Sequence, residues 1–410
     1  MNHELIVAKD NKKFSHLQLK YNLIQALYWG ASCALIGFIA IFLQSKGLTN
    51  TQIGTVTGAS CVINIFLSPT LSTLTSKFNR ISLQAYVLSG MALTGLSYIL
   101  IGYVPLPTPV LMLMYTLTHC INISLVPLIA SIQMNYNAQG HSVNFGIARG
   151  MGSITYAISA VACSNIASWL NPTILTMIYI TGSLLLAAAL FTTPKTYAAG
   201  AHGEKGGNLL HMVFEYKAFF GVLFGFALLF AATTSLSTYL INIIKNLGGT
   251  QELYGIAVFT MAATEMPVMA IASKLQKRFS AMQLFAMAAI FYVMRNLFIA
   301  NATSLIVLIF GLMMQGFSYG LMTAVITVYV NDNLKPKDQV MGQTMISVMT
   351  CGLGSAIGNI FGGVIQDTLG IEMMFAFTDT LTIVGSSIIV LTAIMASKAI
   401  FHRLHKSYQM

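Results

Sequence analysis

Apolar stretches of about 20 residues, the length of an α-helix that crosses a lipid bilayer, follow one another along almost the whole chain. Short polar segments separate them. Within each stretch the apolar residues are continuous and do not alternate with polar ones, which argues against a membrane β-barrel. The pattern predicts twelve transmembrane helices, at residues 18–44, 51–76, 82–104, 108–134, 144–169, 172–193, 217–243, 252–276, 281–301, 303–331, 340–366 and 372–398.

Composition supports an all-α membrane protein. Of the 410 residues, 56% are hydrophobic and only 8% are charged, which is more apolar surface than a water-soluble domain of this size can bury. The five cysteines lie inside predicted helices and form no CxxC or CxxH pattern, so we expect buried thiols rather than disulfides or metal ligands. The sequence has no Walker A, HExxH or GxSxG motif, and we expect no enzyme activity, cofactor or metal.

Lysine and arginine are distributed unevenly between the predicted loops. With the N-terminus inside the cell, 17 of the 21 basic residues fall in the cytoplasmic ends and loops, and the reverse orientation would place the same 17 outside. Because basic residues favour the cytoplasmic side of a membrane, we expect a multi-pass protein of the cell membrane with both termini cytoplasmic. The asymmetry accounts for the net charge of +10, so we expect no binding to nucleic acid.

The two halves of the chain show weak internal similarity. Gly54 and Gly255, at the starts of the second and eighth predicted helices, are 201 residues apart, and the Gly-x-Gly-Ser motifs beginning at Gly150 and Gly352 are 202 apart. Two six-helix bundles related in this way form a parallel repeat, for which the binding site is expected between the halves near the membrane midplane. We expect an N-terminal bundle at 1–195, a glycine-containing cytoplasmic linker at 196–216 and a C-terminal bundle at 217–410.

Two opposite charges lie near the middle of consecutive predicted helices. Glu265 and Arg295 each interrupt an otherwise apolar stretch. A charge at the bilayer centre costs at least roughly 3 kcal/mol and usually faces a bundle interior, where it pairs with another group. Glu265 can accept a proton, and its affinity for protons would depend on burial and on Arg295. One interpretation is a proton-coupling site, and the other is a permanent ion pair that only fixes two helices.

Four stretches carry a resemblance to a known family. They are Phe145–Ser153, which reads FGIARGMGS, Glu265–Met269 in helix 8, Arg295 in helix 9, and Gln315–Gly320 in helix 10. In this order and spacing they resemble the major facilitator superfamily, and within it the branch of lactose permease-like and nucleoside:proton symporters. The resemblance implies the twelve-helix major facilitator fold and proton-coupled transport. Where lactose permease-like proteins place His and Glu in helix 10, this chain has Gln315 and Ser318.

Arg149 and His119 are the polar candidates of the first half. Arg149 lies only a few residues from the inner end of its helix, so its side chain can extend to the cytoplasmic surface. The resemblance instead implies a guanidinium that faces the substrate and makes forked hydrogen bonds to hydroxyls or a carboxylate. His119 lies within helix 4 near Asn122. It is either a proton relay or a neutral histidine satisfied by a neighbouring group.

Helix 1 offers an aromatic candidate site. Gln25, Tyr28 and Trp29 are three and four residues apart and therefore share a helix face. An aromatic ring beside hydrogen-bonding groups suits the apolar face of a sugar or nucleobase, although aromatic packing on a neighbouring helix is the alternative. Polar residues of helices 10 and 11 complete the set of predicted substrate-binding residues: Gln315, Tyr319 and Asn359.

These features predict a secondary active transporter that works by alternating access. The leading hypothesis is proton-coupled uptake of a polar organic solute such as a sugar or nucleoside. Proton-driven efflux of amphipathic compounds is the alternative within transport, and a membrane solute sensor is the alternative outside it. We expect the partners to be the solute, protons and the lipid bilayer, and the protein to be a monomer.

Overall fold

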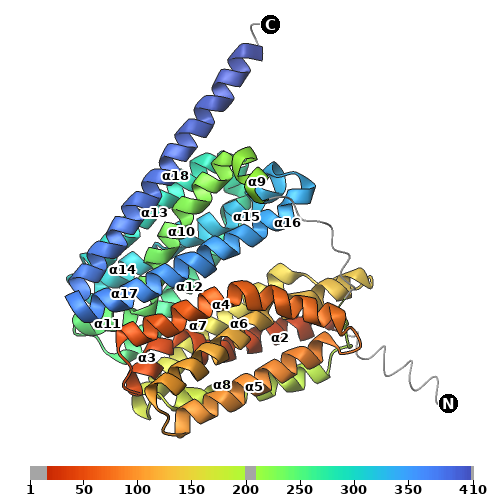
Figure 1. Ribbon diagram of the computed structural model, residues 1–410, viewed down its shortest axis with the longest axis vertical. Helices are drawn as coiled ribbons and strands as arrows, with labels where there is room; N and C mark the ends of the chain where they lie inside the picture. The colour runs from red at the N-terminus through yellow and green to blue at the C-terminus, as the bar shows by residue number, and fades with distance from the viewer. Residues whose placement is uncertain (1–15, 199–208, 408–410) are drawn as a thin grey trace, which may run out of the picture. The chain divides into compact units, whose positions relative to one another are not determined.

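The computed structural model describes residues 16–198 and 209–407, and all regular structure in these two ranges is helical (Figure 1). The prediction of an all-helical fold is confirmed. The elements of the first range are α2 (Leu17–Ser32), the π-helical turn η1 (Cys33–Gly37), α3 (Ile39–Ser45), α4 (Asn50–Lys77), α5 (Leu83–Tyr103), α6 (Thr108–Ala138), α7 (Phe145–Trp169) and α8 (Ile174–Phe191).

The second range contains two further π-helical turns. Its elements are α9 (Leu209–Glu215), α10 (Lys217–Thr238), α11 (Leu240–Asn246), α12 (Gln251–Gln276), α13 (Ala281–Ala300), α14 (Leu305–Met313), η2 (Gly316–Gly320), α15 (Leu321–Asn333), α16 (Pro336–Ser347), η3 (Val348–Gly354), α17 (Ser355–Leu369) and α18 (Ile371–Ser407). Each predicted apolar span coincides with one of these helices or with a run of adjoining ones.

By length and hydropathy alone, fewer helices than the predicted twelve qualify as membrane spans. In the part of the chain that the structure describes, ten helical stretches are long and apolar enough, and an eleventh is added if α2, η1 and α3, which bend by 46°, count as one span. The predicted span 144–169 is a helix, α7, but it does not reach this hydropathy. The reason is its polar content, since α7 contains Arg149 and Asn165 among serines, threonines and glycines.

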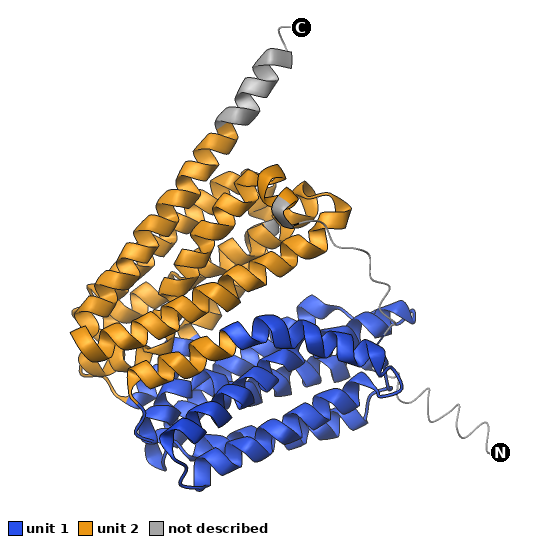
Figure 2. Cartoon of the chain, in the orientation of Figure 1, with its two compact units in different colours: residues 1–48, 62–202, 251–259 blue, residues 49–61, 203–250, 260–410 orange. Residues whose placement is uncertain are grey.

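The chain forms two units (Figure 2). Unit 1 comprises residues 1–48, 62–202 and 251–259, and unit 2 comprises residues 49–61, 203–250 and 260–410. The first turns of α4 therefore belong to unit 2 and the first turns of α12 to unit 1. Part of the predicted linker, residues 199–208, and the chain before residue 16 lie outside the described residues.

Gly54 and Gly255, one of the two glycine pairs that indicated an internal repeat, occupy equivalent close contacts. Within unit 2, a Cβ atom at Gly54 would lie 2.2 Å from the backbone oxygen of Asn359 on α17. Within unit 1, a Cβ atom at Gly255 would lie 2.6 Å from the backbone oxygen of Ala160 on α7. Side-chain carbons do not approach backbone this closely, so both helix starts dock through a bare glycine backbone.

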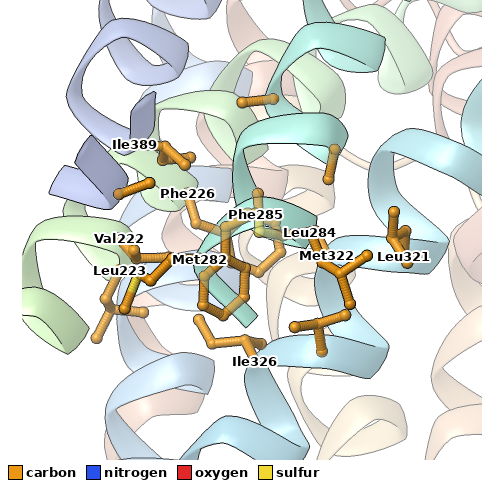
Figure 3. Close-up of a cluster of buried hydrophobic side chains, with 14 of the residues drawn as sticks. Val222, Leu223, Phe226, Met282, Leu284, Phe285, Leu321, Met322, Ile326 and Ile389 are labelled. Carbon is orange, nitrogen blue, oxygen red and sulfur yellow. The ribbon is translucent and has the colours of Figure 1, made fainter. Parts of the chain in front are cut away.

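An apolar core in unit 2 packs around α13, the helix that carries Arg295 (Figure 3). Burial of these side chains holds α10, α13, α15 and α18 together, because apolar and dispersion contacts accumulate over many close-packed atoms. The labelled members of the core are Val222, Leu223 and Phe226 of α10, Met282, Leu284 and Phe285 of α13, Leu321, Met322 and Ile326 of α15, and Ile389 of α18.

Buried tyrosines tie the π-helical turn η1 into unit 1. The hydroxyl of Tyr98 donates to the backbone oxygen of Ala34 at 3.1 Å, and that of Tyr115 donates to Leu35 at 2.8 Å. Backbone carbonyls in a membrane helix need a partner when the regular ladder is interrupted. The two tyrosines from α5 and α6 supply partners for the carbonyls of Ala34 and Leu35, two of the buried residues of η1.

Polar contacts anchor the end of the predicted linker within unit 2. Glu215 of α9 forms an ion pair with Lys335, and the hydroxyl of Tyr216 donates to a carboxylate oxygen of Asp338 at 3.0 Å. The hydrogen bond and charge of Lys335 hold the pKa of Glu215 below its ordinary value. The short helix α9 is thus fastened to the start of α16.

Candidate functional site

Two clusters of polar side chains, one in each unit, contain residues predicted to form the site. We call the set in unit 1 the arginine cluster, and it consists of Gln25, Trp29, Arg149 and Ser153. We call the set in unit 2 the glutamate cluster, and it consists of Glu265, Tyr292, Arg295, Asn296 and Gln315.

In the arginine cluster, the Arg149 guanidinium stacks on an indole ring. Its central carbon lies 4.1 Å from the centroid of the Trp29 ring, and its Nη1 donates to the Ser153 hydroxyl at 2.8 Å. A planar guanidinium over an aromatic face is held by a cation–π interaction and by dispersion. A Cβ atom at Gly152 would lie 2.6 Å from Trp29 Cδ1, so glycine at this position admits the indole to the surface of α7.

A chain of hydrogen bonds fixes the indole. Trp29 Nε1 donates to Gln25 Oε1 at 3.2 Å, and Gln25 Nε2 donates to the Tyr21 hydroxyl at 2.9 Å. Tyr21 in turn donates to the backbone oxygen of Ile129 on α6 at 3.0 Å. The four-residue spacing of these three side chains places them along one face of α2. The predicted grouping of Gln25 and Trp29 therefore has a geometric basis, and Arg149 joins it.

Tyr28 and His119 lie apart from these hydrogen bonds. The Tyr28 hydroxyl is buried and donates to the backbone oxygen of Asn122 at 2.6 Å, while its ring packs edge-on against Trp29. His119 is 5% exposed, makes no hydrogen bond to the arginine cluster among the described residues, and has an unpartnered Nδ1. Tyr28 thus packs against the Trp29 ring without joining the chain of hydrogen bonds, and His119 is buried inside unit 1.

In the glutamate cluster, a carboxylate and a guanidinium are each held by an amide. Gln315 Nε2 donates to Glu265 Oε1 at 2.9 Å, and Arg295 Nη1 donates to Asn296 Oδ1 at 2.9 Å. Arg295 is 0% exposed, and it interacts electrostatically with Glu265 and Tyr292. The predicted pair of Glu265 and Arg295 is therefore electrostatically linked within one cluster.

The helix that carries Gln315 approaches Glu265 closely. A Cβ atom at Gly316 would lie 2.2 Å from the backbone oxygen of Thr264, and one at Gly320 would lie 3.5 Å from the Cα of Glu265. These two glycines begin and end the π-helical turn η2, and Gln315 immediately precedes it. The glycines let η2 pack directly on α12 at the carboxylate, and single π turns are frequent at functional sites.

Three buried polar atoms in the glutamate cluster have no hydrogen-bond partner among the described residues. They are Arg295 Nε, Gln315 Oε1 and the Tyr292 hydroxyl. Leaving a buried polar group unpaired costs roughly 1–3 kcal/mol, so such groups point to a water molecule or a ligand. The set includes both donors and acceptors, which suits a partner that carries hydroxyl groups.

Tyr319 and Asn359 differ in their relation to this cluster. The Tyr319 ring packs 5.8 Å from Phe230, centroid to centroid, and interacts electrostatically with Tyr292, so it adjoins the cluster. Asn359 accepts from the Thr238 hydroxyl at 2.7 Å, and its backbone oxygen accepts from the Tyr239 hydroxyl at 2.9 Å. The structure thus places Asn359 in the packing of α17, where its side-chain and backbone oxygens both accept hydrogen bonds.

Sequence reasoning did not single out Tyr292, Asn296 and Thr382. Asn296 fixes the guanidinium, and its Nδ2 donates to the Thr382 hydroxyl on α18. Tyr292 is three residues before Arg295 on α13, and this helical spacing was the available signal. Thr382 gave no signal, because it lies 86 residues from Asn296. Among the described residues, no group of three or more His, Cys, Asp or Glu could hold a metal ion.

Comparison with known proteins defines the class. The maltose permease of Geobacillus stearothermophilus is 27% identical over 381 residues, covering 91% of this chain and 94% of that protein. The crystal structure of the nucleoside transporter NupG superposes with a TM-score of 0.76 at 14% identity, over 92% of this chain and 99% of that one. A bacterial homolog to the human lysosomal transporter Spinster gives 0.68 at 12% identity, over 92% and 96%. All three are membrane transporters.

The protein is thus a multi-pass membrane transporter of small-molecule solutes and not an enzyme. Residues 17–377 match the family model described as MFS_1 like family, and the chain belongs to this family of the major facilitator superfamily. The resemblance to this superfamily inferred from the four stretches is confirmed.

Proposed function

We propose that this transporter is a symporter that couples uptake of a sugar or nucleoside to proton movement. The observation that carries the proposal is the Glu265 carboxylate of α12, which accepts a hydrogen bond from Gln315 and interacts electrostatically with the buried Arg295. Burial and neighbouring charges set the balance between the ionised and protonated states of a carboxyl group, so changes around it can shift that balance.

The coupling follows from the charges in the glutamate cluster. When Glu265 is ionised, its charge offsets that of Arg295, and when Glu265 binds a proton, Arg295 is left with a positive charge and unpartnered Nε. A solute that supplies hydrogen-bond acceptors to Arg295 would then bind preferentially to the protonated form. By linkage, such a solute also raises the affinity for the proton, which is the requirement for symport.

The arginine cluster supports a solute that has both an apolar face and hydroxyl groups. The indole of Trp29 offers a ring surface, and Arg149 offers planar, forked donors beside it. The names of the relatives agree with this chemistry, since one is a maltose permease and another a nucleoside transporter. We therefore favour a disaccharide, with a nucleoside as the second candidate.

Uptake into proteoliposomes tests the proposed function. With an inward proton gradient, radiolabelled maltose or uridine is expected to accumulate inside above its outside concentration. A protonophore should abolish accumulation, and protein-free liposomes give the background. Uptake that reaches but never exceeds the outside concentration would contradict proton coupling, and absence of uptake for both probes would contradict the proposed solute class.

We also propose that the protein lies in the cell membrane with both termini cytoplasmic, on the strength of its basic residues. In a background without the native cysteines, an impermeant thiol reagent added to intact cells should label Thr250→Cys and leave Lys277→Cys unlabelled. Both side chains are exposed, so accessibility does not bias the comparison. The reverse labelling pattern would invert the orientation.

A further inference from the structure

One end of the Gln315 carboxamide has a hydrogen-bond partner, and the other end has none among the described residues. Its Nε2 donates to Glu265 Oε1 at 2.9 Å, whereas its Oε1 is buried and has no partner among the described residues. The whole residue is 6% exposed. The unsatisfied oxygen lies in the same cluster as two other unpartnered groups, Arg295 Nε and the Tyr292 hydroxyl.

The charge of Glu265 dictates which end of the amide faces it. An ionised carboxylate can only accept hydrogen bonds, so it selects the Nε2 end and leaves Oε1 as an acceptor for another group. A protonated carboxyl carries an O–H donor, which prefers the amide oxygen. Rotation of the carboxamide about its last bond then brings Oε1 to Glu265 and turns the Nε2 donor away from it. Rotation about such a bond has no deep staggered wells to cross.

We propose that Gln315 is a positioning residue whose side-chain amide rotates when Glu265 gains or loses a proton. The side of the amide that points away from Glu265 thereby changes between a hydrogen-bond acceptor and a donor. This inference rests on the proposed function, in which Glu265 binds the transported proton. A group facing that side meets an acceptor when Glu265 is ionised and a donor when Glu265 is protonated. A hydroxyl of the solute, or a water molecule in its place, is the chemistry that both amide orientations can bind.

The other charged and titratable groups around Glu265 come from several elements. Arg295 and Tyr292 of α13 interact with it electrostatically, and Tyr319 of η2 interacts with Tyr292. Asp379 lies on α18, which packs against α13, and it has no electrostatic interaction with Glu265. Gln315 donates a hydrogen bond to the carboxylate, and among these side chains only an amide presents opposite hydrogen-bonding character at its two ends.

Infrared difference spectroscopy on purified protein, without any solute, tests the inference. Protein grown with glutamine labelled by carbon-13 at the side-chain carbonyl is titrated with acid. The carboxyl band of protonated Glu265 is identified by its loss in Glu265→Gln, and the Gln315 band by its loss in Gln315→Met. The Gln315 carbonyl band is expected to move to lower frequency as the Glu265 band appears, because the carbonyl gains a hydrogen bond.

Two variants sharpen the result. In Gln315→Met the Glu265 carboxyl band should move to higher frequency, because its hydrogen-bond acceptor is lost. In Gln84→Met it should not move, since Gln84 is a buried glutamine of unit 1 whose amide bonds only to Pro194, Thr196 and Tyr136.

The possible outcomes separate the inference from the proposed function. A Glu265 band that titrates while the Gln315 carbonyl band stays fixed shows a static hydrogen bond, which overturns the switch and leaves proton coupling intact. A protein in which no Glu265 band titrates overturns the coupling role of Glu265 and the switch together.

Discussion

Replacing Glu265 by glutamine is expected to abolish accumulation of solute and to preserve exchange. Glutamine matches the protonated carboxyl in shape and charge and can keep a hydrogen bond to Gln315, but it cannot release a proton. A gradient of one pH unit supplies about 1.4 kcal/mol, enough for roughly tenfold accumulation. Proteoliposomes containing Glu265→Gln should therefore lose this tenfold excess, while exchange of labelled for unlabelled maltose between equal pools continues.

A second membrane carboxylate provides the matched control. Asp379 lies on α18, and its Oδ1 is buried without a partner among the described residues. Asp379→Asn removes a carboxylate from the same unit and should accumulate maltose like the parent. If Glu265→Gln also accumulates like the parent, Glu265 is a structural partner of Arg295 and the proton binds elsewhere or not at all.

Replacing Arg149 by lysine is expected to weaken solute binding by about tenfold to a hundredfold, or roughly 1.4–2.8 kcal/mol. Lysine keeps the positive charge but has neither the planar face that stacks on Trp29 nor the forked donors. The dissociation constant of maltose, measured by calorimetry on purified protein, reports the loss. The variant should unfold near the temperature of the parent, because the Ser153 contact and the ring packing contribute little to the helix core.

An exposed arginine in unit 1 provides the control, because it shows whether an Arg→Lys substitution elsewhere in this unit also weakens solute binding. Arg80 lies in the turn after α4 and is exposed, so Arg80→Lys should bind maltose like the parent. Equal affinity for Arg149→Lys and the parent would assign Arg149 to the packing of α2 on α7. A fall in unfolding temperature that accounts for the whole loss of binding would lead to the same conclusion.

The candidate-site residues that could be predicted from the sequence are those with a charge inside an apolar helix or with a helical spacing between polar and aromatic side chains. Glu265 and Arg295 were visible because a charge in an apolar helix is costly, and Gln25 and Trp29 because a four-residue spacing fixes a helix face. Asn296 and Thr382 did not stand out, since polar uncharged residues are common in membrane helices. Their contact depends on which faces α13 and α18 turn toward each other, and this is decided by packing.

The run formed by α14, η2 and α15, which is the tenth predicted helix, shows a second limit of sequence reasoning. Gln315 and Tyr319 are four residues apart and would share a face in a uniform α-helix. The π-helical turn from Gly316 to Gly320 has wider backbone rings, so the phase of the helix changes between the two residues. Gln315 consequently reaches Glu265 while Tyr319 packs on Phe230. The contacts of Asn359 were also not visible in the sequence, because the close approach of Gly54 to its backbone oxygen depends on how α4 and α17 pack.

The close contacts at Gly54 and Gly255 also restrict which mutations of these two codons the protein can tolerate. Every missense mutation of a glycine codon introduces a Cβ atom, apart from any other property of the new side chain. At Gly54 and Gly255 that atom would meet an immovable backbone oxygen at 2.2 and 2.6 Å, whereas at Gly150 it would meet nothing within 4 Å. A missense change at Gly54 or Gly255 therefore has no conservative form, whereas one at Gly150 has room for its side chain.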